Sequence, residues 1–167
     1  MSSAPNHPVR QAAVDEFLAG HRIAVVGVSE ASDNFAHTIY RELAAHGYEP
    51  VAVHPTATTV DGDPVHRDVA SVPGDLDGVI VMVSADHADE VVRQCIDRGI
   101  EQIWLFQGIG GGGAVSEAAV RSCADAGVNV VPGACPLMFL EPVGWGHRVH
   151  RSARRLRGNL VVTSEPT

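Results

Sequence analysis

The chain has 167 residues, of which 45% are apolar, so it has the size of one domain and can bury a core of its own. Its 12 basic and 20 acidic side chains give a formal charge of -8, which disfavours a nucleic-acid surface or a polybasic membrane patch. All the basic residues are arginines, which excludes lysine Schiff-base chemistry and a P-loop lysine. An anionic ligand must therefore be held by local features of the fold.

The three cysteines, Cys95, Cys123 and Cys135, are widely spaced and form no CxxC pair. This arrangement indicates neither a disulfide framework nor a zinc ribbon, and it fits a reducing compartment. No apolar run approaches the roughly 18 residues that a membrane span requires. We therefore expect a soluble, unprocessed, cytoplasmic protein with no membrane partner.

Taken in chain order, the sequence begins with a polar stretch, residues 1–8, that we expect to be disordered. Apolar residues from Val9 to Leu18 then recur at helical spacing up to Gly20 and predict an amphipathic N-terminal helix. The continuous apolar run Ile23–Val26, which ends at Gly27, predicts a strand covered on both faces.

Helical and strand patterns alternate through the rest of the chain, which is typical of βαβ units. A loop rich in Thr, Asp, Gly and Pro contains a short apolar piece near Val65 and one helical turn at 69–72, and a flexible glycine loop is predicted at 108–113. The predicted helices are 36–45, 88–96 and 114–126, and the predicted strands are 49–53, 77–83, 102–106 and 129–131.

This alternation predicts an α/β fold, a Rossmann-like doubly wound parallel sheet that forms a single domain with an N-terminal helix. We place the domain at residues 9–145 and an Arg/His-rich C-terminal segment at 146–167. Ligands of such sheets bind where the parallel strands end, so function is expected in the loops after Val26, Val53, Val83 and Phe106.

The loop from Gly27 to Phe35 joins a buried strand to a helix start, where main-chain N–H groups attract phosphate. The dinucleotide fingerprint requires glycine at its third and sixth positions, but Ser29 and Ser32 stand there. The second strand ends in His54-Pro55 without the acidic residue that holds the ribose of NAD. NAD is therefore disfavoured, and the polar loop residues either bind phosphate or only form turns and cap the helix.

Four segments carry a resemblance to a known family: 26–29, 47–55, 104–109 and 126–131. They read Val-Gly-Val-Ser, Gly-Tyr leading to Val-Ala-Val-His-Pro, Trp-Leu-Phe-Gln-Gly-Ile and Ala-Gly-Val-Asn-Val-Val. Together they resemble the small bacterial CoA-binding proteins, which are similar to the N-terminal domain of the succinyl-CoA synthetase alpha subunit. The resemblance covers roughly residues 12 to 140.

The resemblance implies that CoA is the ligand and that three loops contact it. Two departures bear on this: the family often has asparagine where His54 stands, and its first loop often carries basic residues where this chain has Glu30 and Asp33, which repel a pyrophosphate. The binding candidates that the resemblance implies are Gly27, Ser29, Ser32, Asn34, Val53, His54, Pro55, Phe106, Gln107 and Gly108.

No catalytic or metal site is predicted. The phosphorylated histidine of the synthetases belongs to a second domain for which no matching segment is found, His147 and His150 make an incomplete metal site, and Cys135 is expected to pack as a small apolar side chain. Five arginines in residues 148–157 form a solvated tail, contact a partner or neutralise CoA phosphates.

We therefore expect a protein that binds CoA or an acyl-CoA without complete catalytic machinery, for sensing, storage or delivery. The alternatives are an NAD(P)-dependent oxidoreductase and an interaction protein whose nucleotide site has decayed. A homodimer or a protein partner stays open.

Overall fold

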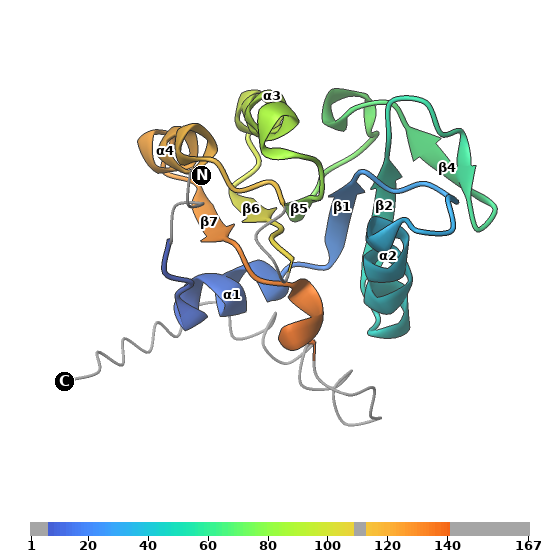
Figure 1. The fold of residues 1–167 in the computed structure, drawn as a ribbon, viewed down its shortest axis with the longest axis horizontal. Helices are drawn as coiled ribbons and strands as arrows, with labels where there is room; N and C mark the ends of the chain where they lie inside the picture. Colours follow the sequence, from blue (N-terminus) through green and yellow to red (C-terminus); the bar gives the residue numbers. More distant parts are fainter. Residues whose placement is uncertain (1–6, 109–112, 141–167) are drawn as a thin grey trace.

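Seven strands form one sheet, and helices cover both of its faces (Figure 1). The computed structural model describes residues 7–108 and 113–140. Neighbouring strands are parallel except β3 and β4, which form an antiparallel hairpin at one edge. The strands are β1 (Arg22–Val26), β2 (Glu49–Val53), β3 (Thr59–Val60), β4 (Asp63–His66), β5 (Gly78–Val81), β6 (Gln102–Leu105) and β7 (Asn129–Pro132). The helices are α1 (Gln11–Leu18), α2 (Phe35–Ala45), α3 (Ala85–Asp97) and α4 (Glu117–Asp125), with short 3₁₀ helices η1 (Val69–Ser71) and η2 (Pro136–Met138).

The strand order is β3-β4-β2-β1-β5-β6-β7. The chain starts near the middle at β1, winds outward through β2 to the hairpin, and then returns past β1 to build β5, β6 and β7 on the other side. This is the predicted α/β, Rossmann-like doubly wound sheet, and the prediction is confirmed. Its topological switch point, where the direction of winding reverses, lies between β1 and β5.

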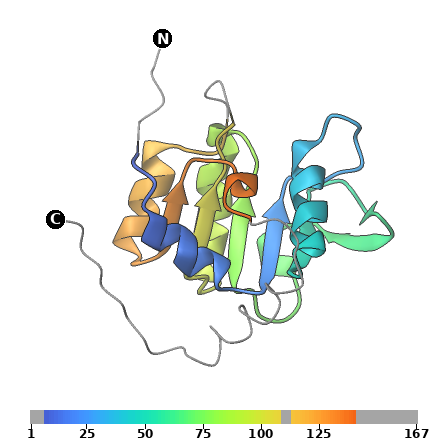
Figure 2. The same cartoon turned by 90° about the horizontal axis from the view of Figure 1, so that it is seen from below.

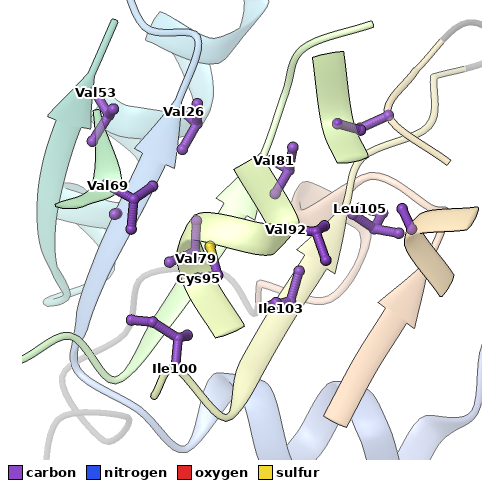
Figure 3. Close-up of a cluster of buried hydrophobic side chains, with 14 of the residues drawn as sticks. Val26, Val53, Val69, Val79, Val81, Val92, Cys95, Ile100, Ile103 and Leu105 are labelled. Atoms are coloured by element: carbon purple, nitrogen blue, oxygen red, sulfur yellow. The ribbon is translucent and has the colours of Figure 1, made fainter. Parts of the chain in front are cut away.

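The face of the sheet under α3, α4 and η1 is packed with aliphatic side chains (Figure 3). Alternate residues of the central strands point to this face, as the two-residue period of a strand requires. The side chains of Val92 and Cys95 cover them from α3. The strand residues that contribute are Ala24, Val26, Val51, Val53, Val79, Val81, Ile103 and Leu105.

The opposite face carries α1, η2 and α2, which lie across the sheet in Figure 2. Trp104 is fully buried there and packs edge-to-face against Phe17 of α1 and Phe139, with ring centroids 5.4 and 5.7 Å away. Its indole N–H donates to the carbonyl oxygen of Ala134 at 3.2 Å. The tryptophan of the predicted signature therefore ties the N-terminal helix and the segment after β7 to the sheet.

The predicted elements differ from the observed ones mainly at their ends. The last helix begins at Glu117 rather than residue 114, because Ser116 caps it by accepting the N–H of Ala119, while the Ala114 N–H donates to the carbonyl of Phe106. Strand β3 was not predicted, since two residues carry no periodicity.

Parts of the predicted organisation fall on residues that the structure does not describe. These are residues 1–6 of the expected disordered N-terminus, residues 109–112 of the glycine loop and the whole of 146–167. The domain boundaries at 9 and 145 stay predictions. Among the residues described, no helix is long and apolar enough to cross a bilayer.

Gly78 of β5 lies against Phe17 of α1, and we predict that Gly78→Ala destabilises the fold by about 1–3 kcal/mol through overpacking. A Cβ at this position would lie 2.9 Å from Cε2 and 3.1 Å from Cζ of Phe17, whose fully buried ring also packs edge-to-face against Trp104. Thermal or denaturant unfolding measures the effect. The double variant Phe17→Leu/Gly78→Ala should lose less than the sum of the two single losses, and strict additivity would contradict the assigned contact.

Candidate functional site

The carboxyl edge of the sheet, where the parallel strands end, collects the loops that follow β1, β2, β5 and β6. Because β1 lies between β2 and β5, the loop after β1 stands at the centre of this edge, beside the switch point. The predicted site residues lie at the end of β2 and on the loops after β1, β2 and β6, so the topology gathers them along one edge.

Gly27 allows the chain to turn closely over the end of β1. Its φ is +109°, in the region that favours glycine, and a Cβ there would lie 2.7 Å from the carbonyl oxygen of Met82 after β5. Its N–H donates to the carbonyl of Val53 at 2.8 Å. Because it has no side chain, Gly27 can follow β1 while its main chain contacts the ends of both β2 and β5.

Asn34 fixes the far end of this loop. Its side-chain oxygen accepts the N–H of His37 at 2.8 Å and caps α2, while its amide donates to the carbonyl of Gly27 at 2.9 Å. Both ends of the loop are thus tied together by one side chain. The first-turn N–H groups of Phe35 and Ala36 have no acceptor earlier in the helix, so they are available to an anion.

Ser29 and Ser32 lie between these two anchored ends. Ser29 is half-buried and Ser32 is exposed. Within the part of the chain that the structure describes, neither hydroxyl makes a hydrogen bond, so capping falls to Asn34 alone and not to the serines.

Glu30, expected to repel a pyrophosphate, has a structural partner. Its carboxylate accepts the main-chain N–H of Asp61, in the turn of the β3–β4 hairpin, at 2.9 Å. Asp61 in turn receives two hydrogen bonds from the Arg41 guanidinium, at 2.8 and 2.7 Å, and its carboxylate lies 2.9 Å from Nε2 of His37. The first loop and α2 therefore hold the hairpin from two directions.

Arg41, followed by His37, holds the pKa of the Asp61 carboxyl well below its usual range. A second contact joins the same elements, because the Tyr40 hydroxyl donates to the Asp63 carboxylate at 2.7 Å. Burial, followed by that hydrogen bond, raises the pKa of Tyr40 above its ordinary value. We call these residues the hairpin clamp: Glu30, His37, Tyr40, Arg41, Asp61 and Asp63.

His54 follows β2, and its ring organises the turn after it. Nδ1 accepts the main-chain N–H groups of Thr56 at 3.2 Å and Ala57 at 3.1 Å. A nitrogen that accepts these donors carries no proton, so the neutral ring bears its proton on Nε2 and offers a hydrogen-bond donor. Pro55 next to it is exposed, whereas Val53 is buried and acts through its carbonyl oxygen.

The loop after β6 places Phe106, Gln107 and Gly108 beyond the switch point, all half-buried. Gln107 pairs with Gly113 through an isolated bridge, and a Cβ at Gly133 after β7 would lie 3.2 Å from its Oε1. The Phe106 carbonyl is so close to Gly113 that no Cβ fits there. The absence of side chains at Gly113 and Gly133 therefore allows the main chain at these two positions to approach Phe106 and Gln107 closely.

Two features of the edge were not among the predicted site residues. Phe35, the first residue of α2, is 44% exposed, and its ring lies 5.7 Å from that of Phe106, tilted by 44°. On the loop after β5, the Ser84 hydroxyl lies 2.8 Å from Nδ1 of His87. The sequence signal for Phe35 was a large apolar side chain at a helix start, and that for Ser84 was its place after a buried strand.

Two of the three cysteines have thiols that burial keeps protonated. Burial raises the pKa of the Cys95 thiol to about 12 and that of Cys123 to about 11, so both stay protonated at neutral pH. Cys135 is a free, half-buried thiol packed against the α1 and α2 face. No group of three metal-binding side chains occurs within residues 7–108 and 113–140.

The winding of the sheet and the glycine turn at its switch point define the class of the protein, a doubly wound α/β domain of the kind that binds nucleotides at this edge. The CoA binding domain family matches residues 21–141, which include all seven strands and leave α1 outside the match. The chain belongs to this family, and the predicted family is confirmed.

Individual proteins are similar to this chain in sequence or in fold. The uncharacterized protein YneT of Bacillus subtilis (strain 168) is 26% identical over 114 residues, which cover 68% of this chain and 81% of YneT. A hypothetical protein from Pyrococcus horikoshii OT3 shares the fold with a TM-score of 0.71 at 21% identity, over 83% of this chain and 94% of that one. The dinucleotide forming acetyl-coenzyme A synthetase 1 of Ca. Korarchaeum cryptofilum is similar with a TM-score of 0.56 at 25% identity, over 65% of this chain and 25% of the synthetase.

Because of the hairpin clamp, we predict that the stability of the fold falls in acid and that it falls less in the variant Asp61→Asn. Since the pKa of Asp61 is lower in the folded than in the unfolded chain, its ion pairs stabilise the fold above about pH 4, and this contribution is lost as the pH falls further. Asparagine tolerates the left-handed backbone at this position, φ 51°, so the substitution removes mainly the charge. Melting temperatures measured from pH 6 to pH 3 should fall further in the wild type than in Asp61→Asn, and parallel curves would contradict the clamp.

Proposed function

We propose that the protein binds CoA, or an acyl-CoA, at the carboxyl edge of the sheet and has no complete catalytic machinery of its own. Its role is then to sense, store or deliver the ligand. The residues proposed to contact the ligand are the predicted ones, Gly27, Ser29, Ser32, Asn34, Val53, His54, Pro55, Phe106, Gln107 and Gly108.

The observation that carries this proposal is the loop after β1. Gly27 brings the main chain against the ends of β2 and β5, and Asn34 ties that turn to the start of α2. Main-chain N–H groups at the start of a helix of 11 residues then face the switch point, where phosphate groups of nucleotides bind in folds of this class. In a member of the CoA binding domain family, the pyrophosphate of CoA is the expected occupant.

Glu30, one of the two acidic residues of the loop, fits this proposal better than the sequence indicated. The Glu30 carboxylate is occupied by the hairpin turn, so part of its charge is compensated by an N–H dipole. Arg41 is bound to Asp61, which leaves main-chain N–H groups and hydroxyls to hold the anion. Ser29 and Ser32 supply two such hydroxyls, since no other hydrogen bond engages them within the described residues.

His54 supports the placement of the nucleotide at the end of β2. Because its Nδ1 is engaged by Thr56 and Ala57, its Nε2–H is the free polar group of the ring. Proteins of the resembled family often have asparagine at this position. Its side chain also offers one acceptor for the turn and one donor for the ligand. His54 is therefore proposed as a donor to an acceptor atom of the nucleotide.

The first test of this function is a comparison of CoA and NAD by thermal shift. At a hundred times its dissociation constant a ligand stabilises the fold by about 2.7 kcal/mol, which corresponds to a shift of about 5 °C or more for a chain of this size. We expect this shift with CoA and none with NAD at the same concentration. Loss of the shift with pantetheine would show that the nucleotide phosphates carry the binding, and a shift with NAD but not with CoA would refute the proposal.

A second test places the phosphates. Ser29→Glu adds a negative charge between the two anchored ends of the loop, and like charges a few ångströms apart should weaken CoA binding about tenfold or more. Isothermal calorimetry measures the affinity, and thermal unfolding confirms that the fold is retained. The matched control is Ser122→Glu on the exposed side of α4, which should leave the affinity unchanged. Equal affinities of wild type and Ser29→Glu would place the phosphates elsewhere.

A further inference from the structure

Two phenylalanine rings meet above the carboxyl edge and leave apolar surface exposed. Phe35 is the first residue of α2, Phe106 lies on the loop after β6, and the centroids of their rings are 5.7 Å apart. Strand β5 lies between β1 and β6, so the two rings bridge the end of β5. Phe35 and Met138 are the large apolar side chains that stay exposed in the described part of the chain, and only Phe35 adjoins the proposed phosphate loop.

The position of the rings relative to the switch point decides which part of a ligand they meet. In doubly wound sheets the ribose of the nucleotide lies at the end of the second strand, and the rest of a long ligand crosses the switch point to the other half of the sheet. Here His54 marks the end of β2 on one side and Phe106 marks the end of β6 on the other. The end of CoA that lies farthest from the adenosine therefore extends toward the aromatic rings.

We infer that the ligand is a CoA thioester with an apolar acyl group, and that Phe35 and Phe106 contact this acyl group. The inference rests on the proposed CoA function and extends it to the substrate class. Free CoA ends in a thiol, which would leave the exposed Phe35 ring with little to bury, whereas an aliphatic chain would remove both rings from water.

A direct binding comparison tests the inference. Calorimetry with the wild-type protein measures the affinities for hexanoyl-CoA, CoA and adenosine 3′,5′-bisphosphate, which is the nucleotide half alone. Burial of about two methylene groups between the rings corresponds to about tenfold tighter binding of hexanoyl-CoA than of CoA. Phe35→Ser should abolish this preference and leave the affinities for CoA and the bisphosphate within about twofold, while Phe35→Leu should keep most of the preference.

The control variant is Leu18→Ser, which removes a partly buried apolar side chain at the opposite edge of the sheet, at the end of α1. It should lower the stability and leave the preference for hexanoyl-CoA intact.

Equal affinities of the wild type for hexanoyl-CoA and CoA would overturn the inference while the CoA function stands. A matching loss of bisphosphate binding in Phe35→Ser would also overturn it, because the rings would then contact the nucleotide. If the wild type bound none of the three ligands, the proposed function would fall together with the inference.

Discussion

The close approach of Gly27 to the Met82 carbonyl is the constraint on which the site depends. A side chain at Gly27 would push the loop after β1 away from β5, and the Gly27 N–H would then leave the Val53 carbonyl. The positive φ at this residue also sets the direction in which the loop departs toward α2. One residue without a side chain thus determines the spacing of three strand ends and the position of the helix start that faces them.

Charged side chains at this edge serve the scaffold more than the ligand. Glu30 and Arg41 both contact Asp61, so these two charged side chains hold the hairpin against α2. Electrostatic attraction of a nucleotide then depends on main-chain dipoles, which are weaker than full charges but fixed in direction. This division explains how an acidic chain can still present an anion site.

Much of the fold could be predicted from the sequence because its strands are continuous apolar runs. Ile23–Val26 and the residues around Ile80 are buried on both faces, and such strands carry their own signal. Two features could not be predicted. The two-residue strand β3 forms because it pairs with β4 in a hairpin, and α4 starts late because the Ala114 N–H donates to the carbonyl of Phe106. At the site, Asn34 was identified in the loop. The partners of Glu30 and His54 depend on contacts that the linear sequence does not contain.

The β3–β4 hairpin also ends the sheet. An edge strand offers unpaired main-chain groups to other chains, and proteins guard such edges with short strands, charges and proline. Here the edge strand β3 has only two residues, and the turn that joins it to β4 carries the charge of Asp61. The same hairpin that the clamp holds against α2 therefore blocks the addition of a strand from another molecule. Because Arg41 and His37 hold the pKa of Asp61 well below its usual range, the folded chain keeps this edge guarded in mild acid.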